Sequence, residues 1–543
     1  MQPASHGRRG YVWAISLVAS LGGLLFGYDW IVISGAEPFY ERFFQLTTPS
    51  EKGWAMASAL VGCLIGAVLS GGLSDKVGRK RLLILAALVF AVSSIGTGLV
   101  ATFTAFNLWR ITGGIAIGLA SNLSPMYIAE VSPAETRGKF VSLNQLTIVI
   151  GILLAQSVNY WIAESGMAVD RKTIAAHQER HGSRLDAKAV AEELAWQVPR
   201  EQRPALVEQF LRLSDNRRGS LDVQAVAAVV AEMNAGRGDE LLQFDPAAVE
   251  LAGRQLVSWN TSVGWGWMFG VTAVPAAFFF LLMFLVPESP RWLAKNGKPA
   301  GARAVLARIG GEAHAERELA SIEETLAGEI QRVNFRDLLD PRLSKIMLLG
   351  ITLAVLQQWC GLNVIFYYAA DIFHAAGYSI SAALQNIVVI GTVNLVFTII
   401  ALYSVDRLGR RALMLIGFVG LALIHTLIGA SYFTHITGKA LLMLTLAAIA
   451  CYGSTLAPVT WVVLSEIFPN RIRGAAMSVS VFALWAGCFI LTFSFPHLKD
   501  VLGPANTFWI YAAICLAGSV LVYFRLPETK GKTLEQIERE VTS

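Results

Sequence analysis

Runs of about 20 apolar residues with almost no charge recur from one end of this chain to the other. A run of that length crosses the hydrocarbon core of a bilayer as one α-helix. Only 15% of the 543 residues are charged, whereas soluble proteins carry about a quarter. The chain is therefore predicted to be an all-α membrane protein that crosses the bilayer many times.

Twelve candidate spans follow from these runs. They lie near residues 11–34, 54–73, 82–101, 105–129, 140–162, 263–286, 343–371, 379–403, 411–432, 438–465, 474–494 and 505–526. The short loops after the second and eighth spans, SDKVGRKR and DRLGRRA, are rich in Arg and Lys, whereas the first loop is mildly acidic. Basic loops stay on the cytoplasmic side, so we expect both termini to be cytoplasmic and the protein to lie in the cell (inner) membrane.

The two halves of the chain repeat each other's motifs. DKVGRK at 75–80 matches DRLGRR at 406–411, and EVSPAETRG at 130–138 matches EIFPNRIRG at 466–474. PESPRW and PETKGK each follow the sixth span of a half. Two six-helix halves are the pattern of a transporter that holds its ligand between the halves, near the middle of the membrane.

Two charged segments interrupt this pattern and set the expected domain boundaries. The first is alanine-rich, and its helix-period stretches predict a helical insert on the outer side. Its stretch SDNRRGSLDVQA resembles an EF-hand turn but lacks the oxygen ligands that calcium needs. The second predicts short amphipathic helices that form a cytoplasmic bundle. The expected domains are 1–163 for spans 1–5, 164–258 for the insert, 259–290 for span 6, 291–342 for the bundle, 343–527 for spans 7–12 and 528–543 for a cytoplasmic tail.

Two opposite charges lie inside predicted spans, Asp29 in LLFGYDW and Arg110 in LWRITGG. Each costs about 2.5–3.5 kcal/mol at the centre of a membrane helix, so we expect the two to face inward and pair. One interpretation is a permanent structural ion pair. The other is a proton site, in which Asp29 takes up a proton when a conformational change separates it from Arg110. The spacing leaves both interpretations open.

The stretch QQWCGLNVIFYY in span 7 concentrates polar side chains in an apolar run. Gly361 lies between its amides and permits a break that would bring them together. The alternative is that the amides only join helices through hydrogen bonds. Three amides and two tyrosines exceed what that role needs, which favours a ligand site. These residues are Gln357, Gln358, Asn363, Tyr367 and Tyr368.

Other spans add amides and indoles. Gln145, Gln156 and Asn159 fall on one stripe of span 5, which also carries Ile152. Amides match a hydroxyl group as donor or as acceptor, and indole rings stack on the apolar faces of sugars. An anion would instead call for Arg or Lys in the cavity. A neutral polyhydroxylated ligand is therefore expected, with further contributions from Asn394 in span 8, Trp461 in span 10 and Trp485 in span 11.

Acidic and basic residues recur in pairs at the predicted cytoplasmic ends of the spans. Ion pairs among them would close the inner side and break on opening, so they form a predicted cytoplasmic gate. Orientation by positive charge alone is the alternative, but it does not explain the repeated acids. The gate residues are Asp75, Arg79, Glu130 and Arg137 in the first half, and Asp406, Arg410, Glu466 and Arg473 in the second.

The sequence holds no pattern of an enzyme or a metal site. All five cysteines fall in apolar segments, and no spacing of ligands suggests a metal. No nucleophile and base stand near each other in or beside the spans. The basic residues cluster in short loops, so the net charge of +5 does not indicate nucleic-acid binding. No cofactor is expected apart from a proton as coupling ion.

The motifs GGLSDKVGRKR, DRLGRR, PESPRWL, QQWCGLNVIFYY, EIFPNRIRG and PETKGKTLEQIE resemble the sugar porter family of the major facilitator superfamily, and most closely its bacterial xylose/proton symporter type. The resemblance covers almost all of the chain outside residues 164–258. It implies alternating access, a monosaccharide ligand and a proton position at Asp29, paired with Arg110. It also implies sugar contacts at Phe26, Gln145, Gln357, Gln358, Asn363, Tyr367, Asn394, Trp461 and Trp485.

Asp29 favours symport, because facilitators that resemble the animal glucose carriers usually have Asn there. Leu484, Ile152 and Thr272 stand where the similar symporters have polar residues, so the site offers fewer hydrogen bonds. The expected function is proton-coupled transport of a hexose or pentose, by a monomer whose partners are the sugar and the lipid bilayer. The alternatives are a sugar uniporter and a sugar sensor that does not transport.

Overall fold

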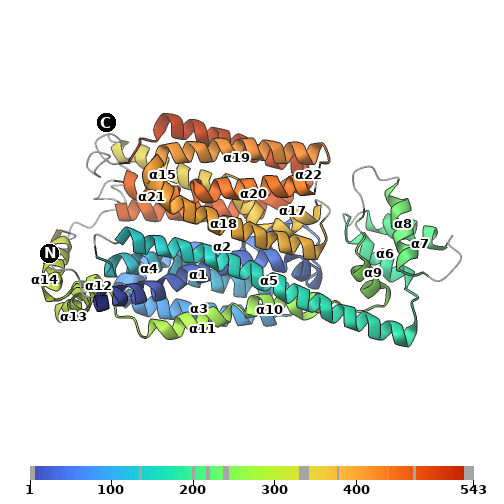
Figure 1. The fold of residues 1–543 in the computed structure, drawn as a ribbon, viewed down its shortest axis with the longest axis horizontal. Helices are drawn as coiled ribbons and strands as arrows, with labels where there is room; N and C mark the ends of the chain where they lie inside the picture. The colour runs from blue at the N-terminus through green and yellow to red at the C-terminus, as the bar shows by residue number, and fades with distance from the viewer. Residues whose placement is uncertain are drawn as a thin grey trace.

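In the computed structural model every element of secondary structure is helical within the described residues, and the predicted all-α architecture is confirmed. Figure 1 shows long helices side by side in one bundle, with α6–α9 at one end and α12–α14 at the other. We call these the insert end and the linker end. The described residues are 6–133, 137–198, 202–215, 221–235, 242, 244–328, 341–375, 378–436, 438–468 and 473–530.

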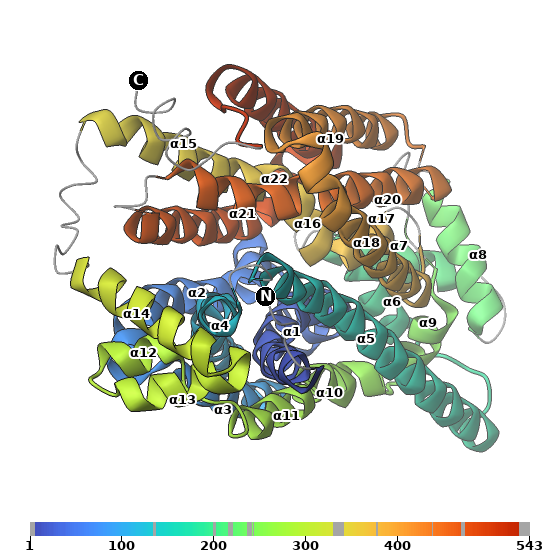
Figure 2. The ribbon, with the colours of Figure 1, turned by 60° about the vertical axis from the view of Figure 1, so that its left-hand side comes forward.

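The long helices form two groups, which we call the first and second halves. Figure 2 shows the second half, coloured yellow to red, above the first, and α5 packs against α18 where the halves meet. The first half comprises α1 (His6–Phe43), α2 (Pro49–Val77), α3 (Arg79–Leu99), α4 (Phe103–Val131), α5 (Arg137–His181), η1 (Asn260–Gly264), α10 (Trp265–Gly270) and α11 (Ala273–Met283). The second comprises α15 (Pro341–Trp359), α16 (Leu362–Tyr367), α17 (Ala369–Ala375), α18 (Ile380–Leu408), α19 (Arg410–Phe433), α20 (Lys439–Ser454), α21 (Leu456–Ile467) and α22 (Arg473–Arg525).

Ten helices among the described residues are long and apolar enough to cross a membrane. Two predicted spans, 474–494 and 505–526, fall together in α22, which is interrupted at Gly503 by a φ of 78° and a ψ of 163°. The predicted span 105–129 corresponds to α4, which is not among the ten. It nevertheless packs between α2 and α3 inside the bundle.

The insert has a hydrophobic core of its own. Its helices are α6 (Ala187–Ala195), α7 (Arg203–Asp215), α8 (Val223–Asn234) and α9 (Pro246–Gly253), and they enclose buried side chains such as Leu194, Phe210 and Val229. α5 continues beyond the bundle to reach them (Figure 1). An ion pair between Arg42 of α1 and Glu193 of α6 ties the insert to the bundle.

The predicted EF-hand-like turn is only partly visible, because residues 216–220 lie outside the described residues. Asp222, the acid that follows, caps α8: its carboxylate accepts a hydrogen bond from the Ala225 amide at 2.8 Å. This carboxylate therefore satisfies a free amide of the helix start.

At the linker end, α12 (Pro290–Lys295), α13 (Pro299–Gly310) and α14 (Glu312–Gly328) form a small bundle. The Trp292 indole donates to the carbonyl of Asp75 at 2.9 Å, and Lys295 pairs with the Asp75 carboxylate at 2.7 Å. These contacts fasten the bundle to the end of α2. The rest of the predicted bundle, 329–340, lies outside the described residues.

α2 and α4 approach very closely because small residues line their contact. A Cβ built on Gly62 would lie 2.1 Å from the Ile111 carbonyl oxygen, and one on Gly114 would lie 2.0 Å from that of Ala59. Small residues four apart let membrane helices pack backbone against backbone. This contact holds α4, and with it Arg110, in place. The four glycines are Gly62 and Gly66 on α2 and Gly114 and Gly118 on α4.

We predict that Gly114→Ala lowers the midpoint of thermal unfolding in detergent by several degrees, because overpacking costs about 1–3 kcal/mol. Gly71→Ala is the matched control on α2, since no atom lies within 4 Å of a Cβ at that position. Its midpoint should equal or exceed that of the unchanged protein. Equal midpoints for Gly114→Ala and the unchanged protein would contradict the packing argument.

Candidate functional site

The segment expected to break does so at Gly361. α15 ends at Trp359 and α16 begins at Leu362, and between them Gly361 adopts a left-handed conformation with a φ of 86°. A Cβ at Gly361 would also lie 2.8 Å from Nε2 of His425. Both the backbone conformation and the neighbouring ring therefore require glycine here.

A break releases backbone carbonyls that a continuous helix would satisfy. The carbonyl of Cys360 accepts a hydrogen bond from Nε2 of His425 at 2.8 Å. His425 comes from α19 and is fully buried, with its ring beside Phe508 and Tyr511. Sequence reasoning missed it, because a lone histidine in an apolar run does not reveal which carbonyl it meets.

The break brings the three amides of span 7 into one hydrogen-bonded chain. Asn363 donates to the side-chain oxygen of Gln358, and Gln358 donates to that of Gln357 at 2.6 Å. Gln357 in turn donates to the hydroxyl of Tyr452 on α20 at 2.6 Å. Tyr452 was also missed, since its position in α20 indicates burial and nothing about its partner. All three amides are buried at the end of α15 and the start of α16, and α16 packs against α20 and α22.

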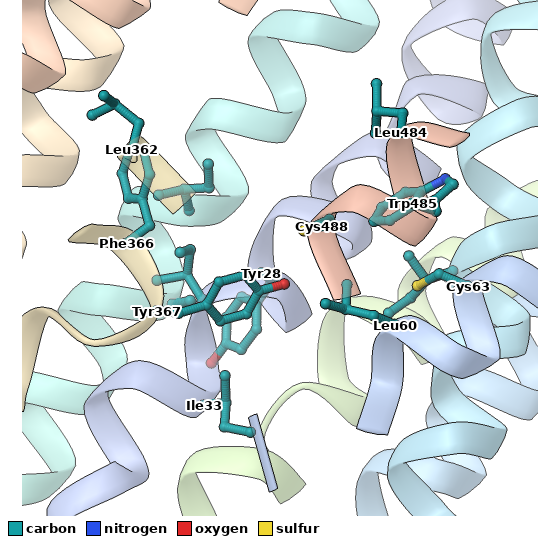
Figure 3. Close-up of a cluster of buried hydrophobic side chains, with 14 of the residues drawn as sticks. Tyr28, Ile33, Leu60, Cys63, Leu362, Phe366, Tyr367, Leu484, Trp485 and Cys488 are labelled. Atoms are coloured by element: carbon teal, nitrogen blue, oxygen red, sulfur yellow. The ribbon is translucent and has the colours of Figure 1, made fainter. Parts of the chain in front are cut away.

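Aromatic rings from both halves meet beside the amides. Phe26 of α1 lies 5.6 Å from Trp485 of α22, and Trp30 of α1 lies 5.8 Å from Tyr367 of α16, measured between ring centroids. Figure 3 shows Tyr367 and Trp485 within a cluster of buried side chains that also includes Leu484. Three of the predicted sugar contacts, Phe26, Tyr367 and Trp485, are thus brought to the junction of the halves.

The amides of the span 5 stripe and the remaining predicted contacts differ in burial. Gln156 of α5 is buried against α18, where a Cβ on Gly391 would lie 1.8 Å from its Oε1. Asn159 instead joins helices of the first half, donating to the Val32 carbonyl at 2.8 Å. Gln145 is half-buried and Asn394 is buried, whereas Trp461 is 37% exposed.

Asp29 and Arg110 form a buried ion pair. The Arg110 guanidinium donates to the Asp29 carboxylate at 2.7 Å, which links α1 to α4. Arg110 also lies 5.3 Å from the ring centroid of Phe269 on α10. A buried charge of this kind is tolerated only while its partner is present, and removing one partner typically costs about 3–5 kcal/mol.

Three of the predicted gate residues of the first half, Asp75, Arg79 and Glu130, form one cluster at the linker end. Arg79 binds Glu130 and Asp75, each at 3.1 Å, and Glu130 also accepts from Ser289. Glu288 accepts the backbone amides of Arg79 and Lys80, each at 3.0 Å. The cluster therefore ties α2, α3 and α4 to the segment that precedes α12.

The second half repeats this arrangement. Arg410 pairs with Glu466 at 3.1 Å, and Glu528 accepts the backbone amides of Arg410 and Arg411. Burial opposes ionisation of Glu528, but the amides of Lys530, Arg410 and Arg411 hold its pKa below the usual value. The described pairs fasten helices within one half, whereas sequence reasoning expected pairs that close the inner side. Glu288 and Glu528 were missed, although the repeated PESPRW and PETKGK motifs carry them. The side chains of Arg137, Asp406 and Arg473 lie outside the described residues.

Two hydrogen bonds between the halves lie at the insert end. Ser50 at the start of α2 meets His497 of α22 at 3.0 Å. Ser381 at the start of α18 donates to Glu164 of α5. The halves are therefore in contact at the end that carries the insert.

Comparison with known proteins places these features in a family. The family model described as "Sugar (and other) transporter" matches residues 15–173 and 250–541, and the gap between the two segments falls inside the insert. The D-xylose-proton symporter of Escherichia coli (strain K12) is 32% identical over 559 residues, covering 97% of this chain and 95% of the relative. The arabinose-proton symporter of Bacillus subtilis (strain 168) is 34% identical over 531 residues, covering 98% and 95%.

Solved structures agree with the relatives. A partially occluded inward open conformation of the xylose transporter from E. coli matches with a TM-score of 0.72 and 31% identity, over 96% of this chain and 100% of that one. The proton:xylose symporter bound to 6-bromo-6-deoxy-D-glucose matches with a TM-score of 0.70 and 31% identity, over 98% and 99%. On the family model and these relatives, which cover nearly its whole length, the chain belongs to the sugar (and other) transporter family.

Proposed function

We propose that the protein imports a monosaccharide, a hexose or a pentose, by proton-coupled symport with alternating access. The observation that carries this proposal is the buried amide chain at the broken helix α15–α16, which lies at the junction of the halves near the Asp29–Arg110 pair. In this proposal the chain crosses the membrane twelve times, counting α4 and both spans of α22. The basic linker end and both termini face the cytoplasm, and the insert lies outside.

The polar atoms at this junction suit a neutral, hydroxylated ligand. Among the buried atoms there that have no hydrogen-bond partner within the described part of the chain are Oδ1 of Asn363, Oε1 of Gln156 and Nε1 of Trp485. Two of them accept and one donates, and a sugar hydroxyl does both. The rings of Phe26, Tyr367 and Trp485 supply apolar faces for the sugar ring. The remaining proposed contacts are Gln145, Gln357, Gln358, Asn394 and Trp461.

Asp29 is the proposed proton carrier. While Arg110 is bound at 2.7 Å, the carboxylate is compensated as an anion. If sugar binding and rearrangement of the halves draw the two apart, an unpaired buried carboxylate is costly and takes up a proton. Release of the sugar and restoration of the pair would then expel the proton on the other side.

Replacing Asp29 tests the coupling. In proteoliposomes, Asp29→Asn should abolish uphill uptake driven by a pH gradient yet retain exchange of labelled D-xylose, because Asn binds no proton. Asp500→Asn, at an exposed acid near the insert end, is the matched control and should leave both assays unchanged. Uphill uptake by Asp29→Asn would show that Asp29 is not the carrier.

A uniporter of the same fold is the second candidate, favoured by the burial of the Asp29–Arg110 pair, which suits a permanent structural link. If sugar flux through the unchanged protein does not depend on the pH gradient, the protein is a uniporter and not a symporter.

Replacing Gln358 tests the amide chain. Gln358→Leu should raise the KM for D-xylose exchange about tenfold or more, because Gln357 and Asn363 each lose a hydrogen-bond partner at a cost of about 1–3 kcal/mol. Gln385→Leu is the matched control, since Gln385 of α18 is exposed. A normal KM in Gln358→Leu would remove the amide chain from the proposed site.

A further inference from the structure

Trp30 directly follows Asp29 in α1, and the proposed mechanism gives it no role. It lies one helical turn after Phe26 on the same face of α1, with the two rings stacked and their centroids 6.2 Å apart. The backbone of α1 has no room to withdraw toward α5 here, because a Cβ on Gly27 would lie 1.9 Å from the Ile148 carbonyl oxygen. The indole is therefore held toward the second half.

The ring of Trp30 reaches the helix that begins at the break. Its centroid lies 5.5 Å from that of Phe366 and 5.8 Å from that of Tyr367, and both of these residues belong to α16. Trp30 thus connects the helix of the proposed proton carrier with the helix that carries Asn363.

The indole N–H of Trp30 is buried and has no hydrogen-bond acceptor within the described ranges. A buried Trp N–H usually finds an acceptor, and an unmet one is a costly group to bury. Oxygen atoms of a sugar would supply that acceptor. Unlike Trp485, Trp30 was not among the residues expected to touch a sugar.

We propose that Trp30 binds the transported sugar directly and limits its size. Its N–H donates a hydrogen bond to a sugar hydroxyl oxygen, and its ring closes the site on the side of Asp29. The bulk of the indole favours a pentose over a hexose, because D-glucose carries one CH2OH group more than D-xylose. The inference rests on the proposed monosaccharide transport.

Two substitutions separate the hydrogen bond from the bulk. Trp30→Phe keeps an aromatic ring and removes the N–H, so the KM of exchange should rise about three- to tenfold for both D-xylose and D-glucose, with little change in maximal rate. Trp30→Ala removes the bulk as well, so kcat/KM for D-glucose relative to D-xylose should rise about tenfold or more. Trp267→Phe on α10, at a Trp that is 57% exposed, is the matched control and should leave the KM for both sugars unchanged.

The outcomes are distinct. Normal exchange by the unchanged protein, together with an unaltered KM in Trp30→Phe and an unaltered sugar preference in Trp30→Ala, would overturn the role of Trp30 alone. If the unchanged protein exchanges neither D-xylose nor D-glucose, the proposed function is overturned, and this inference with it. Thermal unfolding midpoints identify any variant that fails to fold, and Trp30→Phe then carries the test alone, because it preserves most of the ring packing.

Discussion

A helix inside a membrane can be broken only where each backbone group that the break releases finds another partner. In this protein the break at Gly361 depends on that condition. His425 donates a hydrogen bond to the carbonyl of Cys360. The amide side chains beside the break bond to one another and, at the end of the chain, to the hydroxyl of Tyr452. These partners come from α19 and α20, so the local shape of α15–α16 is a product of tertiary packing. The polar junction that we propose as the sugar site exists because the helix is broken there.

A contact in such a site can be predicted from the sequence only when each residue has few possible partners. Asp29 and Arg110 were predictable, because two opposite charges inside apolar spans have few other ways to avoid a large cost. The break was predictable because a glycine stands between amides. His425 and Tyr452 were not, since their partners lie 65 and 95 residues away in the chain and nothing in their own helices points to them. The number of spans was predicted from hydropathy. By length and composition, however, α4 is too polar to be counted as a span, and the two predicted spans in α22 are counted as one because the helix is nearly continuous.

The charged clusters at the linker end show a second limit of sequence reasoning. Repeated acids and arginines indicate ion pairs, and Arg79–Glu130 and Arg410–Glu466 are present. The spacing does not say whether such pairs join the halves or strengthen each one. In this structure the described pairs lie within a half, together with Glu288 or Glu528, whereas hydrogen bonds at the insert end run between halves. Two internally fastened halves that are joined by hydrogen bonds at one end are suited to rocking about the junction where the amides and rings lie.

The departures from the family pattern now have a physical consequence. Leu484 and Ile152 are buried apolar side chains at the junction, so they contribute area and no hydrogen bonds. The unmet donors among the described side chains there include the indoles of Trp30 and Trp485, and the unmet acceptors include the amide oxygens of Gln156 and Asn363. Indole N–H groups only donate hydrogen bonds, and indole rings also fill space. Trp30 and Trp485 therefore supply hydrogen-bond donors that Leu484 and Ile152 lack, and they also make the proposed site narrower. A ligand that fits a narrow site and bonds to these unmet donors and acceptors is small, neutral and rich in hydroxyl groups. In our proposal, Trp30 both limits the size of this ligand and donates a hydrogen bond to it.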